Sequence, residues 1–257
     1  MNKQSPLDSV NQKTYAKAKV LDYYDGLNEL FPAEKVLFEK LSAKIKNSKI
    51  LDIGVGGGRT TKYLLPLAAD YTGIDYVPEF IKRVKRKHES GKFLVGDARN
   101  LKEFADESFD FALFSYNGID VVSHEDRLKV LKEIYRVLKT GGTFMFSSHN
   151  RDYRHFKKPY WMNDFRLNAA LVKNVLSFLF FQPRHWRMKQ YEVYTDEYAI
   201  INDSDHRYSL LIYYIRVAAQ IKQLEEIGFF NIEVYNIRGE PVKTDAETFC
   251  FYYLANK

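Results

Sequence analysis

The chain has 257 residues, 46% of them hydrophobic, a formal net charge of +6 and a single cysteine, Cys250. This length and apolar content suffice for the core of one large α/β domain. One cysteine excludes an intramolecular disulfide, and neither a signal-peptide pattern nor an apolar run of roughly 18 residues is present. We therefore expect one domain in the cytoplasm.

Residues 1–48 predict an N-terminal helical cap. They are mostly polar, with an apolar pattern from Leu27 to Leu41 that Pro32 interrupts. Proline cannot continue a helix from the preceding turn, so we expect helices before and after it.

From Lys49 onward, apolar strand patterns alternate with helix patterns. Such alternation indicates a parallel sheet with helices on both faces. The expected elements are strand 49–53, helix 60–68, strand 71–75, helix 78–88, strand 93–95, strand 109–115, helix 125–138 and strand 143–147.

The alternation stops after Asn150 and returns near the C-terminus. In between, we expect a helix over 167–181 and a strand pair over 190–195 and 197–202. A helix over 211–227 and strands over 231–237 and 248–254 follow, the last two joined tightly enough to pair antiparallel. These expectations make 49–150 the core, 151–208 an insert and 209–257 the completion of the core sheet, within one overall domain.

The positive charge is concentrated in the insert. Residues 151–189 contain nine Lys or Arg and two Asp, a net charge of +7, so the remaining chain is about neutral. Both tryptophans, Trp161 and Trp186, lie in the same stretch. Three interpretations of this basic aromatic insert stay open: a lid over a substrate, a surface for an anionic membrane, and a contact for RNA.

A glycine-rich turn follows the first strand and reads Asp52-x-Gly54-x-Gly56-x-Gly58. Glycines let the backbone turn sharply and approach a ligand closely. A dinucleotide fingerprint G-x-G-x-x-G would need glycine at Arg59, which argues against a nicotinamide-dependent dehydrogenase. The acid Asp75 ends the next strand, where a carboxylate can bind a ribose or cap the helix that follows.

The chain resembles the class I S-adenosylmethionine-dependent methyltransferases, with a methyltransferase type 11/25-like domain. The acid-x-Gly-x-Gly-x-Gly turn and Asp75 match the family's first two strand ends, and Val95-Gly-Asp97-Ala98 matches its third loop. Residues 109–116 match the fourth strand, and Lys139-Thr140-Gly-Gly142 resembles the turn before the fifth, with threonine replacing a proline. The resemblance implies a doubly wound, mostly parallel seven-stranded Rossmann-like sheet with an antiparallel last strand and an inserted lid between the fifth strand and the last helix.

The resemblance also implies S-adenosylmethionine as cofactor, with S-adenosylhomocysteine as its product. Gly54 and Gly56 would face the methionine portion, Asp52 would hold the turn and the amino group, and Asp75 would accept from the ribose hydroxyls. Tyr76 and Ala98 would flank the adenine, and Asp97 would bind its amine. The full predicted cofactor set is Asp52, Gly54, Gly56, Gly58, Asp75, Tyr76, Gly96, Asp97, Ala98, Ser115 and Tyr116.

Three tyrosines of the N-terminal cap, Tyr15, Tyr23 and Tyr24, either cover the methionine end of the cofactor or simply pack.

The loop after the fourth strand, 115–120, lies where this family contacts the methyl acceptor. It lacks the Asp/Asn-Pro-Pro-aromatic motif associated with planar amino groups. Candidate catalytic residues are His149, His124 and Tyr116; each histidine is equally interpretable as a helix cap or surface residue. Candidate substrate-binding residues are Asn117, His149, Tyr191 and Tyr194, although the tyrosines suit cross-strand packing as well.

The sequence thus predicts a methyltransferase that acts on an oxygen or nitrogen of a small-molecule acceptor, without a metal site. The alternatives are a lipid or RNA acceptor bound through residues 151–189, and a non-catalytic S-adenosylmethionine-binding module. Both a monomer and a homodimer are compatible with the sequence.

Overall fold

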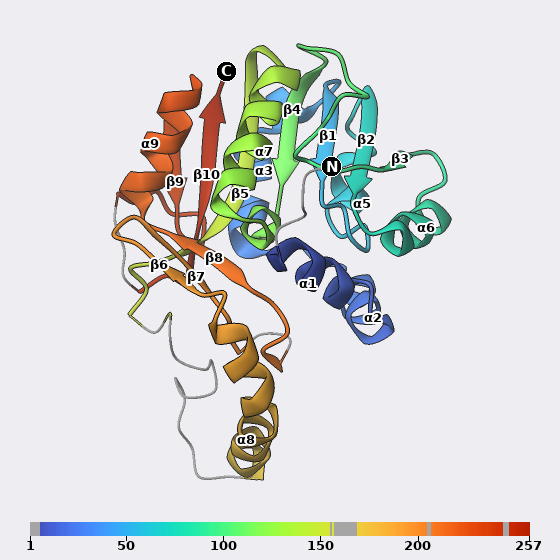
Figure 1. Ribbon diagram of the computed structural model, residues 1–257. Coiled ribbons are helices and arrows are strands. Elements are labelled where there is room, and N and C mark those ends of the chain that lie inside the picture. Colours follow the sequence, from blue (N-terminus) through green and yellow to red (C-terminus); the bar gives the residue numbers. More distant parts are fainter. Residues whose placement is uncertain (1–5, 155, 157–168, 205–206, 244–246) are drawn as a thin grey trace.

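The computed structural model describes residues 6–154, 156, 169–204, 207–243 and 247–257. Within these residues one mixed sheet of ten strands runs through the molecule (Figure 1). The strands are β1 (Lys49–Ile53), β2 (Asp70–Asp75), β3 (Lys92–Val95), β4 (Phe109–Phe114), β5 (Leu138–Asn150), β6 (Val193–Tyr194), β7 (Tyr198–Ile201), β8 (Ile212–Ile215), β9 (Phe230–Tyr235) and β10 (Cys250–Asn256).

The helices of the described chain surround this sheet. They are α1 (Pro6–Tyr15), α2 (Ala18–Gly26), α3 (Pro32–Lys40), α4 (Ser42–Ile45), α5 (Thr61–Leu64), α6 (Pro78–Lys87), the 3₁₀ helix η1 (Gly118–Val121), α7 (His124–Val137), α8 (Ala169–Lys189) and α9 (Val217–Ile227).

Seven strands form the core of the sheet in the predicted manner. Strands β3, β2, β1, β4 and β5 lie side by side and parallel, and β10 pairs antiparallel with both β5 and β9. Apolar side chains of α7 and α9 bury one face of this core, and those of α3, α4 and α6 bury the other. The predicted doubly wound fold with an antiparallel last strand is therefore confirmed.

The structure corrects the prediction for residues 211–227. Only Val217–Ile227 is helical, whereas Ile212–Ile215 forms β8, which pairs parallel with the end of β5 and antiparallel with β7. All four residues of β8 are buried, and a short strand buried on both faces has the same continuous apolar pattern as a buried helix.

The described part of the insert extends the sheet. Strands β6 and β7 form the predicted antiparallel pair, shorter than expected, and β7 joins β8 beside β5. The predicted helix over 167–181 corresponds to α8, which runs further, to Lys189; residues 167 and 168 lie outside the described residues, as does Trp161. In Figure 1, α8 projects beyond the end of the sheet.

Candidate cofactor-binding site

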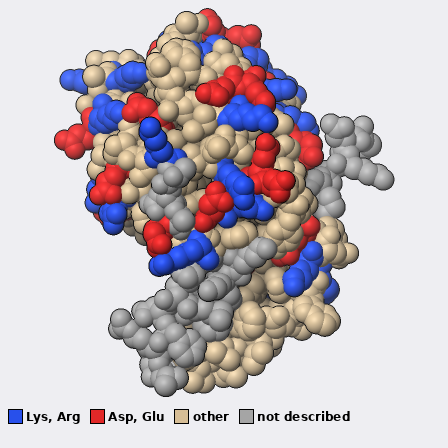
Figure 2. Space-filling view, turned by 90° about the vertical axis from the view of Figure 1, so that its left-hand side faces the viewer, with Lys and Arg blue, Asp and Glu red and all other residues tan. Residues whose placement is uncertain are grey.

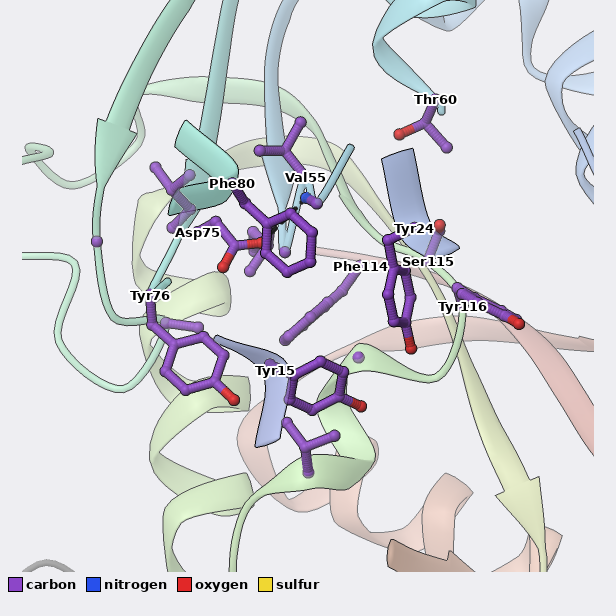
Figure 3. A pocket seen from close by; sticks show the side chains of 18 of the residues that line it. Tyr15, Tyr24, Val55, Thr60, Asp75, Tyr76, Phe80, Phe114, Ser115 and Tyr116 are labelled. Carbon is purple, nitrogen blue, oxygen red and sulfur yellow. Dashed lines mark hydrogen bonds between the residues drawn. The ribbon is translucent and has the colours of Figure 1, made fainter. Parts of the chain in front are cut away.

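A pocket lies at the carboxyl ends of β1, β2 and β4, where open α/β sheets bind their ligands. Helices α1 and α2 lie at the same end of the sheet (Figure 1), and the pocket encloses about 1100 Å³ of empty space that is open to solvent on one side. Figure 3 shows side chains from the cap, the glycine turn and the loops after β2 and β4 converging on it. Nine of the eleven predicted cofactor residues line this wall: Gly54, Gly56, Asp75, Tyr76, Gly96, Asp97, Ala98, Ser115 and Tyr116.

The glycine turn has the backbone conformation that only glycine adopts without strain. Gly54 and Gly56 have φ values of +66° and +53°. A Cβ atom on Gly54 would lie 2.8 Å from Cε2 of Phe114, a ring that also lines the pocket. The turn is therefore a cradle that a side chain at position 54 would fill.

Asp75 connects the glycine turn to the end of β2. Its Oδ2 accepts from the backbone N–H of Gly56 at 3.0 Å, and its Oδ1 accepts from that of Val77 at 2.9 Å. Burial raises the pKa of Asp75 to about 6, and these two N–H groups oppose that rise. Each carboxylate oxygen keeps a second lone pair, so Asp75 can still accept from a ligand hydroxyl on the pocket wall.

The far end of the pocket is formed by Tyr76 and by the loop after β3. Gly96 donates its N–H to the carbonyl oxygen of Asp75 at 3.0 Å, which fixes this loop against β2. The carboxylate of Asp97 forms an ion pair with Arg99 at 2.6 Å, and Arg99 also reaches Asp126 at 2.9 Å. Arg99 lines the pocket too, so Asp97 is held in place by a neighbour that sequence analysis did not identify.

Two predicted cofactor residues, Asp52 and Gly58, lie outside the pocket wall. Asp52 is buried beneath the turn, where it accepts from Thr60 Oγ1 and the Tyr71 hydroxyl, each at 2.7 Å. Burial raises the pKa of Asp52 to about 6. Gly58 has φ +86° and packs against α6. Asp52 is therefore placed to hold the turn from behind. Its predicted contact with the amino group of the cofactor stays a prediction.

Arg59, noted in the sequence only as a departure from glycine, is a buried element of the site. Its guanidinium donates to both carboxylate oxygens of Glu34, which is fully buried in α3, and to Ser115 Oγ at 2.8 Å. It also stacks over the ring of Phe31, 4.4 Å from the ring centre. This pair fastens the N-terminal cap to the glycine turn and to the loop after β4.

Aromatic rings of the cap close the pocket beside that pair. Tyr24 packs edge-on against Tyr116 and Phe80, with ring centres 5.7 and 5.8 Å apart, and Tyr15 lies 5.8 Å from Tyr24. All four rings line the pocket. The Tyr23 ring packs edge-on against Tyr24, 5.4 Å between ring centres, and its hydroxyl lies 3.1 Å from that of Tyr116. Tyr116 is the one catalytic candidate on the wall described here.

His149 and Asn117 lie together just behind that wall. Asp120 Oδ2 accepts from the backbone N–H of His149 and lies 2.7 Å from its Nδ1, so Nδ1 carries the proton in this arrangement. His149 Nε2 then accepts from Asn117 Nδ2 at 3.1 Å. The flanking Tyr116 and Gly118 line the pocket, so Asn117 is the link between His149 and the site.

A buried arginine supports Asp120 from below. Arg127 of α7 forms an ion pair with Asp120 Oδ1 at 2.6 Å, and both side chains are fully buried. Arg127 also donates to Ser148 Oγ at 2.9 Å and to Gln220 Oε1 at 2.6 Å. This cluster joins η1, α7, β5 and α9 beneath His149.

His124, Tyr191 and Tyr194 lie away from the pocket wall. The His124 ring stacks on Tyr198, 4.2 Å between ring centres, and its Nδ1 lies 2.8 Å from the Tyr213 hydroxyl. Burial lowers the pKa of His124. Tyr191 and Tyr194 are exposed beside and within the edge strand β6. These positions give His124 a packing role and place both tyrosines outside the described cavity.

In the described part of the chain, no group of three or more His, Cys, Asp or Glu side chains is arranged to hold a metal ion. Among the same residues, no helix is long and apolar enough to cross a membrane.

Comparison with known proteins identifies the family. Residues 51–146 match the sequence profile of the family described as "Methyltransferase domain". The fold is similar to that of an S-adenosylmethionine-dependent methyltransferase from Clostridium acetobutylicum, with a TM-score of 0.59 and 17% identity over 88% of this chain and 90% of that one. Residues 51–146 form a class I methyltransferase domain. The predicted family and its cofactor, S-adenosylmethionine, are thereby confirmed.

Curated relatives match part of this chain. A demethylmenaquinone methyltransferase of Paenarthrobacter aurescens is 30% identical over 54% of each chain. A phosphoethanolamine N-methyltransferase of Plasmodium falciparum is 27% identical over 61% of this chain and 59% of its own length. The chain thus spans a little over half the length of these two relatives, and the individual site residues stay predictions.

Proposed function

We propose that this protein transfers the methyl group of S-adenosylmethionine to an oxygen or nitrogen atom of a small-molecule acceptor. One observation carries the proposal: the glycine turn, Asp75 and the loop of Gly96 to Ala98 line a single pocket. The residues that line this pocket run from the cap to the loop after β3. Such a lining suits a ligand with an amino-acid end and an adenosyl end.

The chain's own residues fit this cofactor. It supplies a methyl group on a positively charged sulfur, open to in-line displacement. Gly54 and Gly56 offer bare backbone beside the amino-acid end, and Asp75 accepts hydrogen bonds from ribose hydroxyls. The rings of Tyr24 and Tyr116 line the pocket, where they would help to exclude water from the methyl group. Alignment of the nucleophile with the methyl group is then the main catalytic requirement.

For an acceptor whose nucleophile carries a proton, we propose His149 as the base. Asp120 orients the ring through Nδ1, which leaves Nε2 as the basic nitrogen. Asn117 donates to Nε2 in this structure, and it would release Nε2 when the acceptor binds. Asn117 lies between the lining residues Tyr116 and Gly118 and beside His149 Nε2. This position supports Asn117 as a contact for the acceptor.

The acceptor class rests on the relatives. Their names include phosphoethanolamine and demethylmenaquinone as substrates, both small molecules, and another match is a malonyl-[acyl-carrier protein] O-methyltransferase of Pectobacterium atrosepticum, 25% identical over 55% of each chain. Phosphoethanolamine and demethylmenaquinone favour small-molecule methylation over RNA, whereas the malonyl acceptor is carried on a protein. The cytoplasm stays the predicted location, and a monomer and a homodimer both stay open.

The test has two stages. Isothermal titration with S-adenosylhomocysteine should give binding to the wild type and at least about tenfold weaker binding to Asp75→Asn, which keeps the size of the side chain and loses the charge. Lack of binding by folded wild-type protein would overturn the cofactor assignment.

The second stage uses S-adenosylmethionine labelled in its methyl group with fractionated small-molecule, lipid and RNA pools. Label in the small-molecule pool supports the proposal. Label confined to RNA or to a phospholipid would replace the acceptor class, and cofactor binding without transfer to any pool would indicate a binding module.

A further inference from the structure

Helix α8 carries an unusual ridge of exposed apolar side chains. The five most exposed large apolar residues among the described side chains are Phe180, Trp186, Leu176, Val172 and Leu179, all on this helix. Phe180 and Trp186 are 78% and 77% exposed. At 3.6 residues per turn, positions 172, 176, 179, 180 and 186 fall within about a third of the helix circumference, along one side of α8. An exposed apolar ridge of this kind marks an interaction site.

The opposite side of α8 attaches the helix to the protein body. Phe178 packs against Tyr208 with ring centres 6.0 Å apart, and His185 lies against the same ring at 4.7 Å. His185 Nδ1 also lies 2.9 Å from Asn202 Oδ1. These contacts determine which side of α8 faces outward. The exposed ridge residues lie on the other side of the helix from Phe178 and His185.

Charge on α8 itself is of one sign. The segment Ala169–Lys189 contains no Asp or Glu, and its last turns carry Arg184, Arg187 and Lys189. Arg187 and Lys189 are exposed. Figure 2 shows acidic and basic side chains interleaved over the body of the molecule, whereas the described surface at its lower end is largely uncharged.

We infer that α8 is an interfacial helix that inserts its apolar ridge into the headgroup region of an anionic phospholipid membrane. Phe180 and Trp186 would enter the boundary with the acyl chains, while Arg187 and Lys189 would contact lipid phosphates. A second copy of the chain fits the ridge less well, because pairing of two α8 helices would bring together segments without any acid. Pro183 would also interrupt a continuous helix seam.

The position of α8 gives this surface a geometric relation to the pocket. In Figure 1, α8 projects from the same end of the sheet at which α1 and α2 lie beside the pocket. Docking through the ridge would hold that end of the protein near the membrane. The inference itself stands on the ridge and its charges, and its test does not require methyl transfer.

Flotation of the full chain with phosphatidylcholine vesicles, and with vesicles containing 30% phosphatidylglycerol, tests the apolar ridge. We expect wild-type protein to float with the anionic vesicles and Phe180→Ser/Trp186→Ser to partition at least about tenfold less. The matched control, Val36→Ser/Phe230→Ser, removes two half-exposed apolar side chains elsewhere and should float like wild type. Unchanged S-adenosylhomocysteine binding by both variants verifies folding.

Charge reversal tests the second component. Arg187→Glu/Lys189→Glu should lower partitioning onto anionic vesicles at least about tenfold, because it replaces two attractions to the anionic surface with repulsions. Lys102→Glu/Lys132→Glu makes the same charge change at two exposed positions outside α8 and should have little effect. Wild-type protein that floats with neither vesicle overturns the inference. So does a ridge variant that changes only a concentration-dependent dimer in analytical ultracentrifugation, or binding only to RNA.

Discussion

The two halves of the ligand-binding end of the sheet treat their buried carboxylates differently. In the half with the pocket, Asp52 and Asp75 face neutral donors, and burial raises the pKa of each to about 6. In the half beside the insert, Asp120 is neutralised by the guanidinium of Arg127. Asp75 has no built-in cation and lines the pocket, so it can serve a ligand. Asp52 supports the glycine turn from behind, and the guanidinium-paired Asp120 and Glu34 serve the architecture. The difference separates binding groups from supporting groups within one row of loops.

The largest expected effect lies in the supporting half. Arg127→Met should lower the free energy of unfolding by about 3–5 kcal/mol, because it leaves Asp120 buried without its cation. Urea denaturation followed by circular dichroism measures the loss. The control Lys40→Met breaks the exposed pair with Glu233 and should cost at most about 1 kcal/mol.

A second variant separates charge from packing at the same place. Adding Asp120→Asn to Arg127→Met removes the uncompensated charge and should recover part of the lost stability. A loss under about 1 kcal/mol for Arg127→Met alone would show that water already solvates Asp120, and the contrast between the two halves would disappear.

The next effect concerns the cradle in the binding half. Gly54→Ala forces a positive φ on a residue with a side chain and places its Cβ against Phe114, so we expect a loss of about 1–3 kcal/mol in stability. S-Adenosylhomocysteine binding, measured by titration calorimetry, should weaken at least about tenfold as the turn shifts. Gly26→Ala is the matched control, since its φ is not positive and a Cβ there meets open space. Equal affinity in the two variants would remove Gly54 from the ligand contact.

The binding half was predictable because its signal is local. A strand, a glycine turn and an acid at the next strand end follow one another along the chain, so Gly54 and Asp75 could be placed without knowing tertiary contacts. The supporting half depends on contacts between distant segments. Arg127 sits on a helix pattern that ordinarily exposes arginine, and nothing local indicates that it is buried beneath His149.

Elsewhere, one prediction was wrong and one residue's role was missed. Residues 212–215 were expected to be helical, since a short run that is apolar on both faces does not reveal its period. Arg59 was used only as a departure from the glycine of a dinucleotide fingerprint. Its ion pair with Glu34, which lies in the N-terminal cap, was not identified from the sequence. The available signals were a charged residue directly after a glycine turn and an acid in the first turn of α3. Only the fold brings these two residues together.

The pH dependence of ligand binding should distinguish the two kinds of carboxylate. Ribose hydroxyls donate more strongly to an ionised Asp75 than to a protonated one, so affinity should be constant above about pH 7 and fall by up to about tenfold per pH unit below the pKa of about 6. Titrations of S-adenosylhomocysteine from pH 5 to 8 measure this. Asp75→Asn should bind weakly and show a flatter profile.

The stability of the unliganded protein should change with pH in the opposite direction to ligand affinity, because of Asp52 and Asp75. Because burial raises both pKa values above the usual 3.8, the folded state binds more protons between about pH 4 and 6. Their contribution to stability therefore grows as pH falls through that window. An affinity that stays constant to pH 5 would show that Asp75 contacts no ligand hydroxyl.

The smallest expected effect tests where the binding half ends. Tyr194 lies 48% exposed on the edge strand β6, and its hydroxyl donates to Glu192 at 3.1 Å. Because it lies outside the pocket wall, Tyr194→Phe should change the initial rate of methyl transfer less than about twofold, an effect below 0.5 kcal/mol. Tyr116→Phe, which alters a hydroxyl on the wall, is the comparison and should lower the rate more. A tenfold loss with Tyr194→Phe at unchanged cofactor affinity would place the β6–β7 hairpin at the acceptor and extend the binding half into the insert.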